Sequence, residues 1–182
     1  MKIIAFTGMP FSGKSEAVRI AKDMNLPVVR MGDMVWDEVK KRDMSLTDEN
    51  VGKVASEMRE KNGKNIWAKR TIDKIKDIPN NKIIVIDGIR NKEEVDTFKK
   101  ELGQDFILIA IDVNDEIRHK RSLNRGRKDD SLDIEKVKER DRREISWGIK
   151  HVIKNADVKI DNNRDMNYFR SEIKDFLNKY LN

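Results

Sequence analysis

A glycine-rich segment near the N-terminus has the residue types and spacing that suit a bound phosphate chain. This phosphate loop consists of Gly8, Met9, Pro10, Phe11, Ser12, Gly13, Lys14 and Ser15, and Glu16 follows it. The backbone N–H groups of such a loop point at an anion, and the N-terminus of a following helix adds partial positive charge. We expect Lys14 to reach the β- and γ-phosphates and Ser15 to ligate a bridging magnesium ion. The simpler alternative is a structural glycine turn beside an exposed lysine.

A second pair of chemically capable residues closes another apolar run. Asp87 ends the run at residues 84–86, and Arg90 follows after one glycine and one isoleucine. A carboxylate at the end of a buried strand beside the phosphate loop can hold magnesium through water, while the arginine can grip a phosphate. The alternative is a strand-ending turn with a surface arginine.

Arginines gather in the last third of the chain. Arg118, Arg121 and Arg125 are spaced so that they share one helical face, and Arg127 follows in a polar break at residues 126–130. Arg140 begins a further cluster on the next helical segment. Beside a phosphate loop, such residues suit a phosphoryl group on which charge develops. A solvated, salt-bridged basic face is the usual explanation of such a run.

Short apolar runs alternate with helical patterns, which is typical of parallel strands joined by crossover helices. We predict strands over residues 2–7, 27–31, 82–86, 105–111 and 157–160. Residues 33–79 form a helix-prone insertion in which Thr47 resembles a helix start and Gly63 a stop. Further helices are predicted within residues 115–153 and over residues 165–181. The expected fold is α/β, with a five-stranded parallel sheet flanked by helices on both faces.

Length, charge and composition exclude several classes of protein. The 182 residues suit one domain, and 39 Lys and Arg against 33 Asp and Glu give a net charge of +6 that is spread along the chain. No basic stripe with interleaved aromatic residues is present, which disfavours a nucleic-acid partner. Without cysteine there is no disulfide scaffold or thiolate metal site, and two histidines argue against a histidine metal centre. The first apolar stretch is too short for a signal segment or membrane span, so we expect a cytoplasmic protein with no membrane contact.

Taken together, these separated motifs resemble the nucleoside-monophosphate kinase family of P-loop proteins, which includes adenylate kinase and dephospho-coenzyme A kinase. The likeness is strongest to the archaeal adenylate-kinase-related proteins, and it spans nearly the whole chain. It implies a three-layer P-loop NTPase fold with an acceptor-binding insertion at residues 33–79 and a short lid region at residues 118–140. It also implies a kinase that uses ATP and Mg²⁺ and phosphorylates a small nucleotide-like molecule, either a nucleoside monophosphate or dephospho-coenzyme A.

The resemblance further implies roles for particular residues. Asp33 is similar to the aspartate that opens the acceptor-binding helices, although it suits the N-cap of the next helix equally well. Asn162 lies in a loop similar to the one that packs beside the adenine of ATP. Catalytic roles are implied for Lys14, Asp33, Arg90, Arg125, Arg127 and Arg140, nucleotide contacts for the phosphate loop, Glu16, Arg118, Arg121 and Asn162, and metal binding for Ser15 and Asp87.

Some features leave the acceptor open. Arg42, Arg59 and Arg70 are the only arginines of the insertion, so a monophosphate acceptor is not secured. Trp36 and Trp67 suit packing better than stacking on a base. A second class of function is a regulatory NTPase that hydrolyses or senses nucleotide without a small acceptor. The oligomeric state, monomer or homodimer, is also left open.

Overall fold

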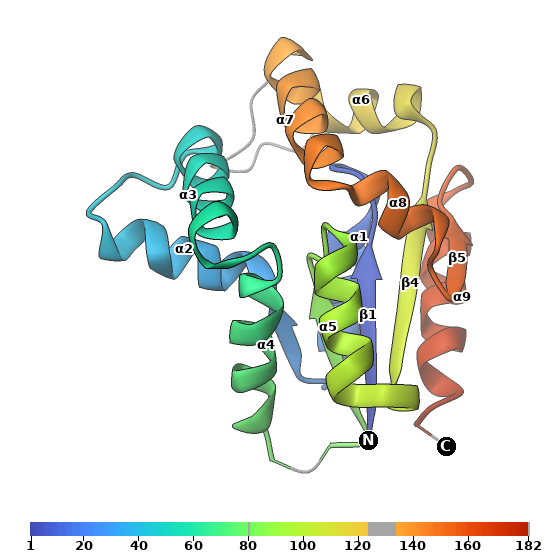
Figure 1. Cartoon of the computed structure of the whole chain (residues 1–182). Helices are drawn as coiled ribbons and strands as arrows, with labels where there is room; N and C mark the ends of the chain where they lie inside the picture. The colour runs from blue at the N-terminus through green and yellow to red at the C-terminus, as the bar shows by residue number, and fades with distance from the viewer. Residues whose placement is uncertain (80, 124–133, 182) are drawn as a thin grey trace.

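The chain is built on a parallel sheet whose strands are connected by helices (Figure 1). The structure is a computed structural model that describes residues 1–79, 81–123 and 134–181. Five strands lie in the order β2-β3-β1-β4-β5, and each neighbouring pair is parallel. Their bounds are β1 Lys2–Thr7, β2 Val28–Arg30, β3 Ile83–Asp87, β4 Phe106–Asp112 and β5 Val158–Asp161.

Apolar runs form the central strands because helices cover both faces of the sheet. Residues 3–6 of β1 and 83–86 of β3 are fully buried, as expected for β-branched and aliphatic side chains on a doubly covered sheet. All five predicted strands are confirmed, with small shifts at their ends. The second strand stops at Arg30 because Met31 already begins a helix.

Helices pack on the two faces as separate layers. Their bounds are α1 Lys14–Asp23, α2 Met31–Lys41, α3 Asp48–Asn62, α4 Ile66–Lys76, α5 Lys92–Leu102, α6 Asp115–Leu123, α7 Ile134–Trp147, α8 Ile149–Lys154 and α9 Met166–Asn178, with a 3-10 turn η1 at Gly103–Asp105. One apolar cluster joins the sheet to α1 and α9, and another joins the opposite face to α4, α5 and α8. The expected three-layer α/β fold is confirmed.

The helical insertion consists of α2, α3 and α4, and it projects to one side of the sheet (Figure 1). Thr47 is the N-cap of α3, where its hydroxyl accepts a hydrogen bond from the N–H of Asn50 at 3.2 Å. Gly63 ends α3 with a φ of 91°. The predicted start and stop of this helix are therefore confirmed.

The division of the chain stays a prediction. This applies to the single domain over residues 1–182, to the acceptor-binding role of residues 33–79 and to the lid role of residues 118–140. Arg125 and Arg127 lie outside the described residues. Within the described ranges, no helix combines the length and apolar character that a membrane crossing requires.

Candidate functional site

The phosphate loop turns the chain from β1 into α1 at the carboxyl edge of the sheet. Gly8 and Gly13 adopt φ angles of 151° and 111°, and a methyl group at Gly8 would stand 2.7 Å from the carbonyl oxygen of Ile111. A side chain is therefore excluded where the loop begins. Phe11 is held at a φ of 62°, a left-handed conformation that costs a non-glycine residue free energy and recurs at binding loops.

Lys14 opens α1 and lies buried at the inner end of the loop. Its Nζ atom donates hydrogen bonds to the carbonyl oxygens of Gly8 at 2.5 Å and Met9 at 2.9 Å. Burial, reinforced by the nearby Arg90 cation, lowers the pKa of Lys14 to about 7. A desolvated ammonium held against carbonyl dipoles interacts strongly with any anion that enters the loop.

Two predicted nucleotide contacts lie behind the loop instead of on the cavity wall. The Asn162 side chain donates to the carbonyl oxygen of Ser12 at 2.8 Å, and Nη1 of Arg118 donates to the carbonyl oxygen of Pro10 at 2.9 Å. Arg118 is 1% exposed and is also paired with Asp141. Both side chains therefore support the shape of the loop.

Arg121, the third predicted contact from this group, does line the cavity. Its Nη2 atom donates to the carbonyl oxygen of Asn162 at 3.0 Å, while Nη1 is buried and has no hydrogen-bond partner among the described residues. This leaves one arm of the guanidinium for a ligand. Ser15 and Glu16, on the first turn of α1, line the same cavity.

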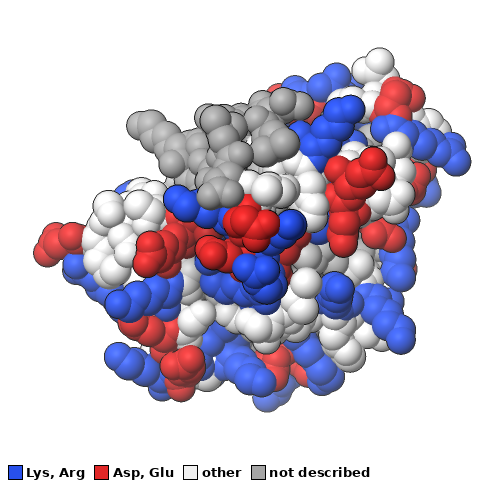
Figure 2. Space-filling view, turned by 90° about the horizontal axis from the view of Figure 1, so that it is seen from above, with Lys and Arg blue, Asp and Glu red and all other residues white. Residues whose placement is uncertain are grey.

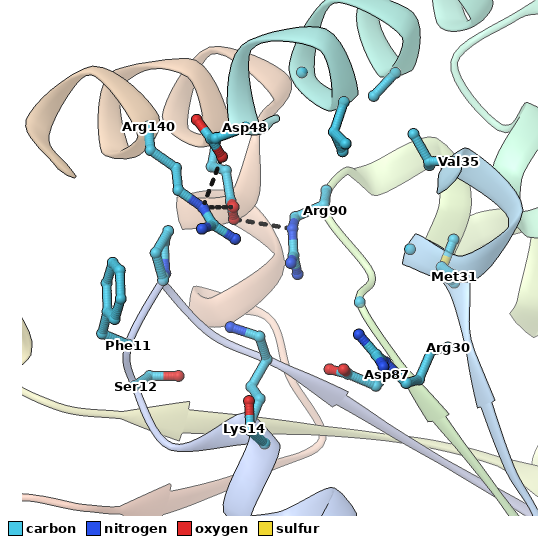
Figure 3. Close-up of a pocket in the computed structure, with 18 of the residues that line it drawn as sticks. Phe11, Ser12, Lys14, Arg30, Met31, Val35, Asp48, Asp87, Arg90 and Arg140 are labelled. Carbon is cyan, nitrogen blue, oxygen red and sulfur yellow. Dashed lines mark ion pairs between the residues drawn. The ribbon is translucent and has the colours of Figure 1, made fainter. Parts of the chain in front are cut away.

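Asp87 ends β3 beside Arg30, the last residue of β2, and the sheet register pairs the two positions. Both line the cavity that contains Lys14 (Figure 3). The Oδ1 atom of Asp87 is buried and accepts no hydrogen bond from any described residue. A buried carboxylate oxygen without a partner is costly, and a hydrated divalent cation would satisfy it. Asp87 and Ser15 therefore fit the predicted magnesium role.

The protein alone does not complete a metal site in the described part of the chain. No group of three or more histidine, aspartate or glutamate side chains there comes together in a way that could hold a metal ion. Phosphate oxygens and water would have to supply the remaining ligands of a magnesium ion, as they usually do for this cation.

Arg90 and Arg140 share the buried carboxylate of Glu144. Nε of Arg90 lies 2.9 Å from Oε2 of Glu144, and Nε of Arg140 lies 3.5 Å from Oε1. Asp48, from α3, lies 3.5 Å from Nε of Arg140 and 2.6 Å from Nη2 of Arg143. Figure 3 marks the ion pairs of Arg90, Arg140 and Asp48 on one side of the cavity. Charges from three separate elements therefore meet there.

Glu144 stays ionised in this cluster. Burial opposes its ionisation, but the charges of Arg90, Arg140 and Lys14 hold the pKa of Glu144 below its usual range. Sequence analysis assigned no role to Glu144 or Asp48. The four-residue spacing of Arg140 and Glu144 is a sequence signal for their pairing. No such signal exists for Asp48, which lies 95 residues before Arg143.

The cavity has a volume of about 430 Å³. Beyond Lys14 the cavity is lined by the ends of β2 and β3, the loop after β3, and helices α2, α3, α4 and α7. We call the cavity-lining residues of all these elements together the distal wall. The apolar members of the distal wall are Met31, Val35, Trp36, Val51, Ala55, Trp67 and Trp147. All three tryptophans of the chain therefore face one cavity, which the sequence did not indicate.

The acceptor residues predicted from the insertion separate into two groups. Arg59 lines the cavity, but it is 8% exposed and its guanidinium lies 2.9 Å from Glu94. Arg42 and Arg70 both pair with Glu38, at 3.3 and 3.0 Å, and are not among the cavity-lining residues.

Asp33 lies within the first turn of α2 and is not among the cavity-lining residues. The N-cap alternative for this residue is wrong, because α2 begins at Met31 and its N-cap is Arg30. The side chain of Asp33 is 48% exposed and lies 3.7 Å from Nη1 of Arg30. Partial burial raises the pKa of its carboxyl. Its role at an acceptor stays a prediction.

Figure 2 shows the molecule from above, and acidic and basic side chains adjoin one another on this face. No extended single-sign field is visible among the described residues of that face. This mixture agrees with the interspersed charges of the sequence, and the absence of a nucleic-acid partner stays a prediction.

The fold and the site define a P-loop protein with the architecture of small-molecule kinases. The chain is similar to shikimate kinase from Aquifex aeolicus, with a TM-score of 0.53 and 18% identity over 97% of this chain and 96% of that one. It is also similar to a gluconokinase from Sinorhizobium meliloti, with a TM-score of 0.58 and 12% identity over 98% of this chain and 92% of that one. At these identities the likeness concerns the fold alone.

Closer relatives show the family. A family model described as an AAA domain matches residues 7–138. The UPF0200/UPF0201 protein of Archaeoglobus fulgidus is 48% identical over 98% of this chain, which spans 56% of that protein's length. The UPF0200 protein of Methanosarcina barkeri is 45% identical over 100% of this chain and 97% of its own length. The chain belongs to the AAA domain family and to the UPF0200 proteins.

Proposed function

We propose that this protein is a phosphotransferase that moves the γ-phosphoryl group of Mg-ATP to a small nucleotide-like acceptor, either a nucleoside monophosphate or dephospho-coenzyme A. The proposal rests on one observation: Lys14, Asp87 and the distal wall all line the same cavity. Its volume of about 430 Å³ falls within the range of small-molecule sites. A site that only hydrolysed or sensed a nucleotide would not need the part of the cavity that lies beyond Lys14.

The donor side would be held by the phosphate loop. Its N–H groups and Lys14 bind the phosphate chain, and Ser15 and Asp87 hold the magnesium ion, which neutralises phosphate charge when bound. During transfer an acceptor oxygen forms a bond to the γ-phosphorus while the bond to the β,γ-bridging oxygen breaks, and ADP leaves with that electron pair. Where the acceptor oxygen is a hydroxyl, its proton is released to water. The free arm of Arg121 is available to the donor.

The distal side would supply positive charge that is fixed before the reaction. Arg90 and Arg140 are held by Glu144, so little reorganisation is needed when charge develops on the phosphoryl group. A loose transition state needs positioning more than covalent chemistry, so no activated protein nucleophile is required. The kinase names of the two similar structures support this reaction class, and the tryptophans support a planar acceptor. A cytoplasmic location remains part of the proposal.

Phosphorus NMR tests the reaction directly. The protein is incubated with Mg-ATP and, in separate samples, with nucleoside monophosphates, dephospho-coenzyme A or buffer. A new phosphoester or diphosphate resonance is expected with an acceptor, and Lys14→Ala should abolish it. Lys174→Ala serves as the control, because Lys174 is an exposed lysine on α9.

The alternative outcome is equally clear. Release of inorganic phosphate that no acceptor diverts would contradict the kinase and favour the regulatory NTPase. Unchanged ATP binding by Lys14→Ala would contradict the role of the phosphate loop itself.

A further inference from the structure

Most arginines of the distal wall are already matched with protein carboxylates. The wall contains Arg30, Arg59, Arg90, Arg140 and Arg143. The last three are paired with Glu144 or Asp48. Arg59 is paired with Glu94, which is 0% exposed. Glu94 also accepts hydrogen bonds from the backbone N–H groups of Arg90 and Asn91, at 2.7 and 3.3 Å.

These four arginines are poorly placed to exchange their partners for a ligand. Moving Arg59 to an incoming anion would leave the buried Glu94 without its counter-ion, and moving Arg90 or Arg140 would take away one of the two arginines that share the buried Glu144. The cost of an uncompensated buried charge is large. The four therefore shape and balance the wall more than they attract an anionic acceptor.

Arg30 differs from the other four. Its nearest carboxylate oxygen is Oδ1 of Asp33, at 3.7 Å, and no residue in the described ranges accepts a hydrogen bond from its guanidinium within the usual distance. The guanidinium lies 5.3 Å from the ring centroid of Trp36. Figure 3 shows Arg30 next to Asp87 at the cavity. All five N–H donors of Arg30 are thus available to a ligand.

Besides the carboxylates of Asp33 and Asp87, the side chains around Arg30 are apolar. Met31 and Val35 of α2 line the cavity next to it and are 2% and 7% exposed, and Trp36 lies under its guanidinium. Such a surface suits a flat or aliphatic body, because apolar area is removed from water when the body binds. One available cation beside an apolar surface is complementary to a molecule with one anionic group.

We propose that Arg30 determines acceptor specificity, and that the acceptor has a planar or apolar body with one anionic group, a carboxylate or a phosphate, bound by Arg30. This inference rests on the proposed phosphotransferase function and specifies the substrate class of the same cavity. Arg30 sits at the end of β2, one strand away from Asp87. An acceptor anchored there is held close to the carboxylate assigned to the magnesium ion.

Tryptophan fluorescence can test this inference without any turnover, because all three tryptophans line the cavity. The full chain is first saturated with Mg²⁺ and a non-hydrolysable ATP analogue, so that the probes cannot occupy the donor site. Two matched pairs of probes are then titrated: AMP against adenosine, and 4-(hydroxymethyl)benzoate against its neutral amide. Within each pair the members differ in their anionic group.

The expected result is that at least one anionic probe binds about tenfold or more tightly than its neutral partner, as for a charge-assisted hydrogen bond. Arg30→Gln should remove this preference, and Arg30→Lys should retain part of it. Arg164→Gln is the matched control: Arg164 also lies over an aromatic ring, that of Tyr168 at 4.8 Å, and has a long ion pair of 3.9 Å, but is not among the cavity-lining residues. It should behave like the wild type.

Three results would overturn the inference: equal binding of anionic and neutral probes, a preference that survives Arg30→Gln, or no saturable binding of either anionic probe. The melting temperature of Arg30→Gln should lie close to that of the wild type, because the guanidinium of Arg30 donates no hydrogen bond to the described part of the protein. A failure of the proposed function looks different, since anion binding at Arg30 would then persist while no phosphoryl group is transferred in the NMR assay.

Discussion

Nε of Arg90 lies 2.9 Å from Oε2 of Glu144, and this ion pair joins the loop after β3 to α7 on one side of the cavity. The two side chains are 17% and 4% exposed. The same carboxylate reaches Arg140 one helical turn earlier. The position of two phosphate-directed arginines therefore depends on a single acidic side chain that itself faces the P-loop lysine.

Glu144→Gln should strongly destabilise the protein. The substitution keeps the shape of the side chain but leaves Arg90 and Arg140 without their shared counter-ion, and breaking a buried pair in this way costs about 3 kcal/mol or more. Urea denaturation measures the loss. Glu139→Gln, at an exposed position on the same helix, should change the free energy of unfolding by about 0.5 kcal/mol or less. Equal effects of the two variants would contradict the role of Glu144.

Nucleotide affinity should fall as the pH rises above neutrality. The pKa of Lys14 is about 7 in the free protein, and bound phosphates favour the charged ammonium, so this pKa is higher in the complex. Between the two pKa values the free protein must take up a proton to bind, and affinity declines by up to about tenfold per pH unit. Below pH 7 this dependence disappears.

Calorimetric titration of Mg-ATP from pH 6 to pH 9 measures this effect. Lys14→Arg is the informative variant, because arginine stays protonated throughout this range and the slope should vanish even where affinity is reduced. A wild-type protein with constant affinity from pH 6 to pH 9 would show that Lys14 does not titrate there.

Gly13→Ala should disrupt the phosphate loop. Gly13 has a φ of 111°, and a methyl group there would lie 2.2 Å from Nδ2 of Asn162, the atom that donates to Ser12. We expect a loss of about 2 kcal/mol in unfolding free energy from backbone strain and the broken hydrogen bond. ATP binding should weaken together with stability, as calorimetry and urea denaturation can show.

Gly32→Ala should have the opposite effect on stability to Gly13→Ala. Gly32 lies within α2, and a methyl group at this position has no atom within 4 Å. Alanine should therefore stabilise the helix by about 0.5–1 kcal/mol. If Gly13→Ala and Gly32→Ala had the same effect on stability, the loop geometry described above would be wrong.

Arg118→Gln should weaken nucleotide binding although Arg118 does not line the cavity. Its guanidinium links Pro10 of the loop to Asp141 of α7, and glutamine is too short to hold both. The buried Asp141 would lose its cation, with an expected cost of about 3 kcal/mol. Thermal unfolding and ATP titration check both effects, and Lys120→Gln, an exposed neighbour on α6, should affect neither. If Arg118→Gln lowered the stability but left the affinity for ATP unchanged, Arg118 would not be needed to shape the phosphate loop for binding.

The parts of the site that could be predicted from the sequence depend on local structure. The phosphate loop, the N-cap at Thr47 and the stop at Gly63 involve neighbours within a few residues, so their spacing indicates their conformation. The strands were recognised because continuous apolar runs suit a sheet covered on both faces. Asp87 was recognised for the same reason, as the polar residue that ends such a run.

The roles of residues that depend on partners far away in the sequence are harder to predict. The sequence predicts nucleotide contacts for Arg118 and Asn162, but whether they face the nucleotide or the back of the loop depends on how α6 and β5 pack. Arg30 was not identified, because an arginine that ends a strand looks the same in sequence whether or not a carboxylate neutralises it.

By itself the sequence determined a phosphate loop on a parallel α/β sheet and the place of Asp87 at the end of a buried strand, since both follow from short-range patterns of residue type. Only the tertiary structure decided which arginines of the distal wall are paired with Glu144, Asp48 and Glu94, and that the guanidinium of Arg30 donates no hydrogen bond to a described residue. The physical reason is that the effect of a charge depends on its burial and on the charges near it, and those neighbours come from helices far apart in the chain.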